Sequence, residues 1–268
     1  MKIGKLDFDL DKKGYIMGIL NVTPDSFSDG GRYVPIEEAV ARALKMVEEG
    51  ATIIDIGGES TRPGHAPVTV QEEIKRVVPV IEALVPLIDV PISIDTTKSE
   101  VAKAALDAGA SMINDVWGFK YDPNMARVAA EYDVPVCLMH NRKEAKYDAL
   151  ITDMVSDLEE SLQIALNAGI KKDKIILDPG IGFAKTLADN LEVMKALSVF
   201  KAMGYPILLG TSRKSMIGQA LNLPVTERLE GTIATTVLGY IEGCRIFRVH
   251  DVRENFRALK MTELMRQP

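Results

Sequence analysis

The run Thr52-Ile53-Ile54-Asp55-Ile56 is short and rich in β-branched residues, which is typical of a buried strand. It leads into the polar loop Gly57-Gly58-Glu59-Ser60-Thr61-Arg62-Pro63-Gly64 and then into Val70–Leu84, whose apolar residues recur with a helical period. A second short strand is predicted at Ile92–Asp95. A strand, a helix and a strand in this order predict two parallel strands joined by a crossover helix.

The same unit recurs along the rest of the chain. Strands are predicted at Tyr15–Leu20, Thr52–Ile56, Ile92–Asp95, Ser111–Asn114, Pro135–Met139, Lys174–Asp178, Pro206–Gly210 and Arg245–Val249. Predicted helices include Ile36–Glu49, Val70–Leu84, Glu100–Ala108, Ala149–Ala168 and Thr226–Ile241. Eight such units, with no GxGxxG turn after the first strand, favour a closed (β/α)8 TIM barrel over the alternative, an open doubly wound sheet. An N-terminal β-hairpin, Lys2–Phe8 turning back through Asp9–Gly14, is expected to cap the bottom of the barrel.

The composition indicates one globular domain, residues 1–268, because 47% of the side chains are hydrophobic and 26% are charged. A net charge of −6 argues against nucleic acid or an anionic membrane as a partner. No segment approaches the roughly 20 apolar residues that cross a bilayer, and no export signal is evident, so we expect a cytoplasmic protein. Cys137 and Cys244 lack the spacing of a zinc site and are expected to be small buried apolar residues.

Polar residues follow the predicted strands at their carboxyl ends, which is where barrels of this type place their active sites. These candidates are Asn21, Asp95, Asn114, Asp178, Lys214, Arg248 and His250. All three histidines, His65, His140 and His250, fall on this face. Each Asp or Asn alone is equally typical of a turn or a helix N-cap. Polar groups at all eight strand ends favour a functional site.

The chemistry of these groups suggests what they bind. Asp95, Asn114 and Asp178 supply acceptors that suit a flat heterocycle with adjacent N–H donors. Lys214 is placed to donate to a ring carbonyl, although a solvated basic pair on this loop is an equal alternative. Because Arg248 and His250 are two residues apart, they are predicted to face the same side of an extended strand end.

The first and last strands of a closed barrel are neighbours, so Asn21 is expected beside Arg248 and His250. Together they suit a dianionic phosphate group, and the amide oxygen of Asn21 suits Mg²⁺, which binds few protein ligands besides phosphate oxygens and water. The alternative for Asn21 is a turn-forming residue before a proline.

At these residues the sequence resembles the dihydropteroate synthase family of the folate pathway. The matching segments are Met17–Gly31, Asp55–Gly64, Ser93–Thr96, Ile113–Asp115, Asp178–Phe183, Ser212–Ser215 and Arg248–Val252. The resemblance implies a transferase that condenses 6-hydroxymethyl-7,8-dihydropterin diphosphate with p-aminobenzoate, giving 7,8-dihydropteroate and pyrophosphate. It also implies Mg²⁺, a homodimer, and sulfonamides as competitors for the p-aminobenzoate site.

The resemblance further implies a role for each matching residue. The pterin would be bound by Asp95, Asn114, Met139, Asp178, Phe183 and Lys214. The diphosphate would be bound by Asn21, Arg248 and His250, with Asn21 as the metal ligand. The p-aminobenzoate would be bound by Phe27, Ser60, Thr61, Arg62, Pro63 and Ser215. The catalytic residues would be Asp95, Lys214 and Arg248.

An aryl amine is already neutral at pH 7, so this reaction needs no dedicated base, and the sequence offers none. Pyrophosphate departure is the difficult step, which Mg²⁺, Arg248 and His250 would ease by neutralising charge. The family's dissociative route passes through a pterin-methyl cation, which Asp95 would stabilise.

The loop after the fifth strand departs from the family pattern, since Asn141-Arg142-Lys143-Glu144 replaces a Gln-Gly and Pro-containing segment. No role is predicted for this loop or for His140. Two alternatives remain. A pterin-binding methyltransferase that uses methyltetrahydrofolate would not need the diphosphate site. A non-catalytic barrel would be expected to have degraded first and second loops, which are intact here.

Overall fold

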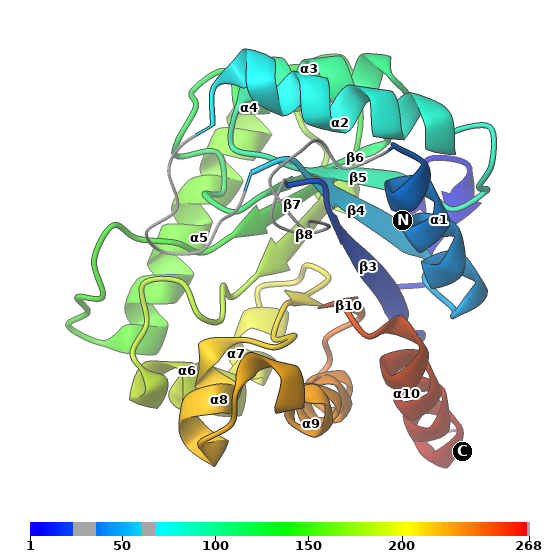
Figure 1. The fold of residues 1–268 in the computed structure, drawn as a ribbon. Coiled ribbons are helices and arrows are strands. Elements are labelled where there is room, and N and C mark those ends of the chain that lie inside the picture. The colour runs from blue at the N-terminus through cyan, green and yellow to red at the C-terminus, as the bar shows by residue number, and fades with distance from the viewer. Residues whose placement is uncertain (24–35, 60–67, 267–268) are drawn as a thin grey trace.

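Parallel strands at the centre of the molecule form a barrel that is ringed by helices (Figure 1). The computed structural model describes residues 1–23, 36–59 and 68–266. The barrel strands are β3 (Tyr15–Asn21), β4 (Ile53–Gly57), β5 (Ile92–Asp95), β6 (Met112–Asp115), β7 (Val136–Met139), β8 (Ile175–Asp178), β9 (Leu208–Leu209) and β10 (Ile246–Val249). Their order is β8-β7-β6-β5-β4-β3-β10-β9, and every described pairing between them is parallel. The predicted (β/α)8 TIM barrel is confirmed.

The barrel closes between β8 and β9 through a narrow seam. The pairing across it is a single parallel bridge between Leu177 and Ile207 within the described residues. The backbone N–H of Leu177 donates to the carbonyl of Pro206 at 2.9 Å. By contrast, β3 and β4 pair over five consecutive residues. The seam is therefore the weakest join in the ring of strands.

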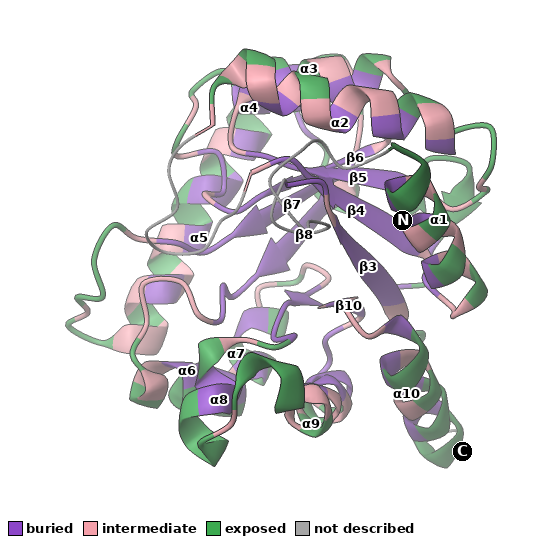
Figure 2. Ribbon diagram, viewed as in Figure 1, coloured by how far each residue is buried: buried purple, intermediate pink, exposed green. Residues whose placement is uncertain are grey.

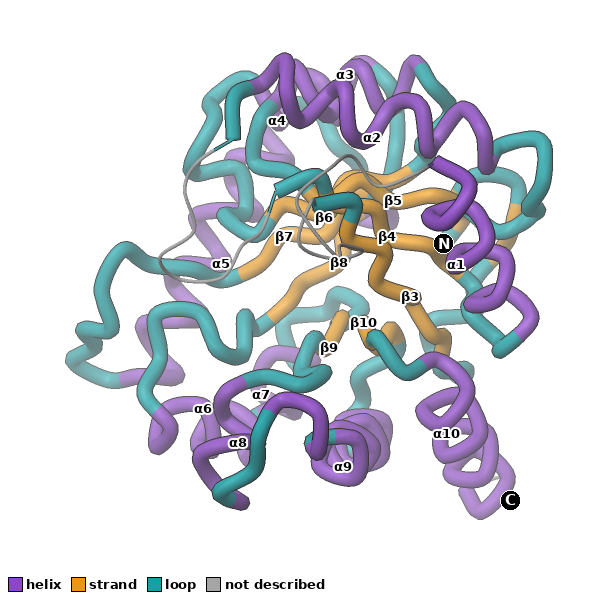
Figure 3. Tube along the Cα trace, in the orientation of Figure 1, coloured by secondary structure: helices purple, strands orange, loops and turns teal. Residues whose placement is uncertain are grey.

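Helices cover the outside of the barrel (Figure 3). They are α1 (Ile36–Glu48), α2 (Val70–Leu84), α3 (Ser99–Asp107), α4 (Met125–Glu131), α5 (Leu150–Asn167), α6 (Leu187–Lys195), α7 (Leu197–Lys201), α8 (Ser215–Leu221), α9 (Leu229–Ile241) and α10 (Val252–Arg266), with 3₁₀ turns at Lys172–Lys174 and Val225–Glu227. The prediction for α2 has the observed bounds, because Thr69 caps it by accepting from the N–H of Glu72. Among the described residues, none of these helices is long and apolar enough to cross a membrane.

The N-terminal hairpin is shorter than the sequence suggests. Its strands, β1 (Lys2–Ile3) and β2 (Leu6–Asp7), pair antiparallel around Gly4, whose φ is +57°. The predicted turning segment, Asp9–Gly14, follows both strands instead of leading back from Lys2–Phe8, because the chain already turns back at Gly4. The cap itself is confirmed, since Ile3, Phe8 and Leu10 pack against the lower ends of the barrel strands.

The barrel interior changes from apolar to polar along its axis. Side chains in register on neighbouring strands point to the same side, and alternate residues point inward. The lower inward layer is apolar and buried: Met17, Ile53, Met112, Cys137, Ile176, Leu208 and Ile246. The outward residues of the same strands pack beneath the helices, so the strands are buried on both sides (Figure 2). Cys137 and Cys244 are both free and buried, as predicted.

Candidate active site

A layer of buried polar side chains lies above the apolar one, at the carboxyl ends of the strands. We call this set, together with the partly exposed Arg248, the mouth layer: Asp55, Ser93, Asp95, Asn114, Asp178 and Arg248. Strand register explains their meeting, because Gly57 pairs with Asp95 and Asp95 pairs with Asn114. Asp95, Asn114 and Asp178 were predicted at this rim, and the structure brings all three there.

Arg248 joins two carboxylates across the mouth layer. Its Nε donates to Asp55 Oδ2 at 2.6 Å, and its Nη2 donates to Asp95 Oδ2 at 2.5 Å. Asp55 Oδ2 also accepts from Asn114 Nδ2 at 3.2 Å. Burial alone would lower the pKa of Arg248, but the charges of Asp55 and Asp95 outweigh it and raise that pKa. The sequence predicted Arg248 near a phosphate group and did not predict its two carboxylate partners.

The two carboxylates have unused acceptor capacity. Asp55 Oδ1 and Asp95 Oδ1 are buried and make no hydrogen bond within the described part of the chain. Burial raises the pKa of Asp95 to about 7, against the opposing pull of Arg248 and with help from the charge of Asp55. Buried oxygens of this kind are normally hydrogen-bonded, so these two favour a ligand with N–H groups or a cation.

Asp178 and Lys214 form the opposite wall of the mouth. Asp178 Oδ1 accepts from the N–H of Gly180 at 2.7 Å. Its Oδ2 and Lys214 Nζ approach the same point, since a Cβ on Gly210 would lie 3.7 Å from the first and 3.8 Å from the second. Lys214 Nζ also donates to the carbonyl of Ile181 and lies 4.7 Å from the ring centroid of Phe183. An acidic acceptor, a cationic donor and an aromatic face therefore meet here.

Burial shifts both charged groups of this wall toward their neutral forms. It raises the pKa of Asp178, although the charge of Lys214 acts against the shift. It lowers the pKa of Lys214 to about 8, although Asp178 acts against that shift. Met139, which is in register with Asp178 on β7, is 2% exposed and adds an apolar surface.

Asn21 ends β3 beside Asp95. A Cβ on Gly57 would lie 3.6 Å from Asn21 Oδ1 and 3.7 Å from Asp95 Oδ2, so the absence of a side chain there leaves both oxygens facing one small space. The described residues contain no cluster of three or more His, Cys, Asp or Glu that could hold a metal ion. A cation at this place would have few ligands from the protein.

His250 follows β10 and is oriented by Ser212. The backbone N–H of His250 donates to Ser212 Oγ at 3.1 Å, and Ser212 Oγ lies 3.0 Å from His250 Nδ1. Ser212 Oγ accepts from the backbone and, when it also donates its proton to Nδ1, the imidazole proton is on Nε2. Arg42 Nη2 donates to the carbonyl of His250 at 2.9 Å and ties this strand end to α1.

Of the six residues predicted to bind p-aminobenzoate, the structure describes one. Phe27, Ser60, Thr61, Arg62 and Pro63 lie outside the described residues, as does His65. Ser215 is described and is the exposed first residue of α8.

The two ends that flank residues 60–67 are linked to each other. Glu59 Oε1 accepts from the N–H of Val68 at 3.1 Å. Lys98 joins Glu59 to the buried Glu73 on α2, with 2.5 Å between Lys98 Nζ and Glu73 Oε2. This link fixes where the second loop leaves and re-enters the fold.

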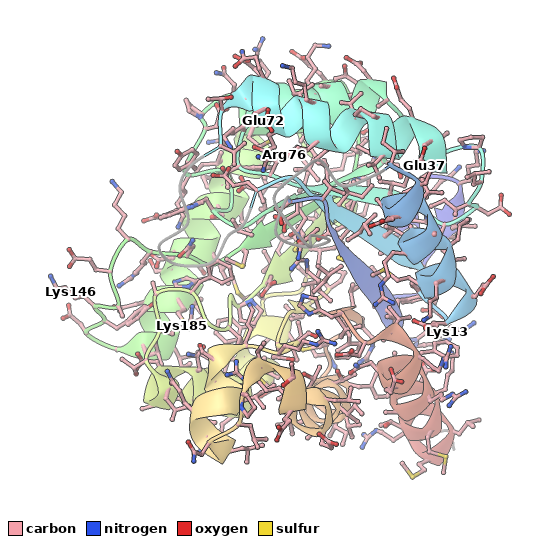
Figure 4. The ribbon with its side chains drawn as sticks, in the orientation of Figure 1. Lys13, Glu37, Glu72, Arg76, Lys146 and Lys185 are labelled. Carbon is pink, nitrogen blue, oxygen red and sulfur yellow. The ribbon has the colours of Figure 1, made fainter. Side chains whose placement is uncertain are left out.

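Sequence reasoning missed Asp55, Lys185 and the partners of His140. Asp55 had a signal, because it is a carboxylate inside a run of isoleucines and has the inward parity of Gly57. Lys185, which is labelled in Figure 4, had none, since its side-chain partner His140 lies 45 residues away along the chain. The unexplained loop after β7 is tied to α5, where Arg142 Nε donates to Asp157 Oδ2 at 2.5 Å.

Comparisons with known proteins agree with this arrangement. Residues 17–250 match the family model described as pterin binding enzyme. The dihydropteroate synthase of Clostridium beijerinckii is 58% identical over 266 residues, which are 99% of this chain and 99% of that protein. The solved structure of the Clostridium difficile dihydropteroate synthase, obtained in the presence of pteroic acid, superposes with a TM-score of 0.95 at 52% identity, covering 98% of this chain and 100% of that one. The Xanthomonas albilineans dihydropteroate synthase with 4-aminobenzoic acid gives a TM-score of 0.92 at 44% identity, covering 97% and 95%.

Proposed function

Since this chain belongs to the dihydropteroate synthase family of pterin-binding enzymes, we propose how its barrel mouth condenses 6-hydroxymethyl-7,8-dihydropterin diphosphate with p-aminobenzoate to give 7,8-dihydropteroate and pyrophosphate. The observation that carries the proposal is the mouth layer, where unpartnered carboxylate oxygens lie opposite a buried lysine. The methyltransferase and the non-catalytic barrel, which remained as alternatives from the sequence, have no support among these relatives.

The pterin ring lies across the mouth layer. Asp178 Oδ2 accepts from the adjacent N–H groups of the ring, and Asn114 and Asp95 make further contacts from β6 and β5. Lys214 donates to an oxygen or nitrogen of the ring. Met139 and Phe183 pack against its faces. Enclosing the ring gives the buried Asp55 and Asp95 oxygens partners that the free protein lacks.

The diphosphate extends toward β3 and β10, where Asn21 and His250 lie. His250 would donate from Nε2 while its Nδ1 faces Ser212 Oγ. Arg248 Nη1 would supply a further donor while Nε and Nη2 hold the two carboxylates. Each of these donors strengthens its contact as negative charge builds on the leaving group.

The residues at this end fit Mg²⁺. Asn21 Oδ1 would bind the ion, with the unpartnered Asp95 Oδ1 nearby as an acceptor for a metal-bound water. A single amide ligand suits an ion that is held mainly by diphosphate oxygens and water. When bound, Mg²⁺ would neutralise diphosphate charge and so make pyrophosphate a better leaving group.

Loss of pyrophosphate leaves positive charge on the pterin methylene, and Asp95 responds to it. Burial raises the pKa of Asp95 to about 7, close to neutral pH, so its ionisation responds to neighbouring charges. A nearby positive charge favours the ionised form, so the carboxylate stabilises the cation as it develops. The neutral amine of p-aminobenzoate then attacks the methylene carbon and loses its proton to water, so no protein base is needed.

The amine is held by the first and second loops together with Ser215 at the start of α8. Glu59, fixed by Lys98, sets the position at which the second loop begins. We place Phe27, Ser60, Thr61, Arg62 and Pro63 around the ring and carboxylate of p-aminobenzoate, on the basis of the matching segments. Sulfonamides would compete for the same positions.

The chain is expected to form a homodimer in the cytoplasm. The dimer proposal is supported by α9, which carries no charged side chain from Gly231 to Ile241 and exposes 41% of Leu238 and 44% of Ile241. Sedimentation of the purified protein at micromolar concentration tests it. A monomer would refute it.

The direct test of the function is to mix the purified protein with the pterin diphosphate, p-aminobenzoate and Mg²⁺. Dihydropteroate and pyrophosphate should appear in equal amounts. No product above background from folded protein would refute the proposed function.

A further inference from the structure

A second cluster of polar groups, built around the buried His140, lies after β7. We call it the His140 cluster, and its members are His140, Lys185, Asp157 and Arg142. His140 directly follows β7, and its side chain is fully buried. Lys185 ends the loop 179–185, which leads from β8 toward α6 (Figure 4). None of the residue roles assigned to the reaction uses this cluster.

Lys185 is saturated with acceptors. Its Nζ lies 3.0 Å from His140 Nδ1, 3.0 Å from the carbonyl of Gly180 and 3.0 Å from the carbonyl of Phe183. An ammonium group has three protons, so these contacts account for all of them. The lysine therefore joins β7 to two points of the loop after β8.

The contact with Asp157 fixes the tautomer of His140. Because a carboxylate only accepts, the ring proton is on Nε2, and Nδ1 is the acceptor that faces Lys185, whose pKa is lowered by burial to about 7. Nε2 lies 2.9 Å from Asp157 Oδ2, which also accepts from Arg142 Nε at 2.5 Å. Burial, followed by the charge of Lys185, lowers the pKa of His140 to about 3, so the imidazole is neutral. With both nitrogens occupied inside the protein, His140 does not transfer protons to substrate.

The conformation of the loop 179–185 depends on the contacts that Lys185 makes. Gly180, Gly182 and Ala184 have φ values of +68°, +83° and +44°, and for alanine this conformation is strained. The loop lies so close to β7 that a Cβ on Gly180 would come 2.0 Å from the carbonyl oxygen of His140. The amino group of Lys185 donates to two carbonyls of this loop, those of Gly180 and Phe183, and removing it would leave both carbonyls without this donor.

This loop shapes the pterin wall. Gly180 holds Asp178 Oδ1 through its backbone N–H, and Phe183 carries the ring that lies beside Lys214. A change in the path of the loop therefore moves an acceptor and an aromatic face together.

We propose that His140 is a positioning residue for the pterin site, which holds the Lys185 ammonium through its neutral Nδ1 and thereby fixes Gly180 and Phe183 around the pterin. This inference rests on the pterin contacts under the proposed function. It gives the loop after β7, which the sequence left unexplained, the task of anchoring the histidine through Arg142 and Asp157.

Two substitutions of His140 test the roles of its two ring nitrogens one at a time. In His140→Asn the amide oxygen replaces Nδ1 and keeps an acceptor for Lys185. In His140→Gln the longer amide reaches Asp157 and leaves Lys185 without that acceptor. We expect His140→Gln to weaken binding of the pterin diphosphate roughly five- to tenfold, the loss of about one hydrogen bond. His140→Asn should stay within about threefold of the wild type.

Direct binding of the pterin diphosphate, measured by calorimetry in the absence of p-aminobenzoate, gives the primary readout. Steady-state kinetics should show the same rise in KM for the pterin and a KM for p-aminobenzoate that stays within about twofold. Lys185→Met should reproduce the pterin effect, and adding His140→Gln to it should cause little further loss, because the two act through one contact. If His140→Gln does not fold, Lys185→Met alone decides the matter.

Lys120→Met is the matched control. Lys120 Nζ donates to the carbonyl of Asp157 at 2.9 Å and pairs with Glu160 at 3.8 Å, both on α5 and outside the loop 179–185. Its pterin affinity should be unchanged. Equal pterin affinity in wild type, His140→Gln and Lys185→Met, or a matching rise in both KM values, would overturn the inference. Wild-type protein that binds the pterin without forming dihydropteroate would instead refute the proposed function.

Discussion

Removing Arg248 should destabilise the protein by an amount that grows with pH. Arg248 neutralises Asp55 and Asp95 through contacts of 2.6 and 2.5 Å, in a layer where both carboxylates are buried. Arg248→Met keeps the length of the side chain and removes its charge. Removing one partner of a buried ion pair costs about 3–5 kcal/mol, and since 18% of the Arg248 side chain is exposed we expect about 3 kcal/mol at pH 6.

The pH dependence comes from Asp95. Its pKa is about 7 in the folded protein, above the unfolded value of 3.8, so its contribution to stability is fully present below 3.8 and is lost as pH rises through 7. In the wild type this loss ends once Asp95 has ionised, above about pH 7. Arg248 lowers the pKa of Asp95, so the variant keeps the proton to higher pH and continues to lose about 1.4 kcal/mol per pH unit.

The difference in unfolding free energy between wild type and Arg248→Met should therefore widen by about 1 kcal/mol between pH 7 and pH 8. Urea unfolding followed by circular dichroism at pH 6, 7 and 8, without substrate or Mg²⁺, measures it. Arg245→Met is the control, because within the described part of the chain the Arg245 guanidinium donates to the carbonyls of Asp11, Tyr240 and Cys244 and to no carboxylate. Its cost should not change with pH. A gap for Arg248→Met that is constant or narrows from pH 7 to 8 would refute the reasoning.

Four further predictions concern substrate binding, the stability of the loop after β8 and the metal requirement. Asp178→Ala should abolish measurable pterin binding while the protein stays folded, because it removes the acceptor opposite Lys214; unchanged pterin affinity by calorimetry would contradict the role of Asp178. Arg62→Ala should raise the KM for p-aminobenzoate about tenfold, as expected for one lost charged contact, with the pterin KM unchanged; the reverse pattern in steady-state kinetics would reassign the second loop. Gly180→Ala should cost about 3 kcal/mol in urea unfolding, because its Cβ meets the His140 carbonyl at a φ of +68°; a variant as stable as the wild type would mean that the loop adapts easily. Chelating Mg²⁺ with EDTA should stop turnover and leave binding of 6-hydroxymethylpterin intact, and full activity in EDTA would exclude the metal requirement.

The sequence predicted the barrel well because the signal for each unit is local. The strand starting at Ile92 has its predicted bounds, and α2 begins at its predicted residue because Thr69 provides a cap. The seventh strand was predicted at Pro206–Gly210 but covers only Leu208–Leu209. Its pairing partners, and therefore its length, depend on how the ring closes, which the local pattern does not contain.

The site was predictable where a polar residue ends a strand and was not where a polar residue lies within one or is paired across the barrel. Asp95, Asn114 and Asp178 reach the mouth for the first reason. Arg248 was predicted beside a phosphate group, but the structure pairs it with Asp55 and Asp95. Which carboxylate an arginine pairs with depends on the register between strands that are far apart in the chain. That register cannot be predicted from a single sequence.

The narrow seam between β8 and β9 lies at the proposed pterin wall. Asp178 ends the strand on one side of the seam, and Gly210 and Lys214 follow the strand on the other. A pterin held by Asp178 and Lys214 would connect the two sides of the seam. It would add contacts at the place where the described backbone joins the ring of strands through a single β-bridge. The bound substrate would then hold the two sides of the seam together, so substrate binding would stabilise the closed barrel as well as prepare the site for the reaction.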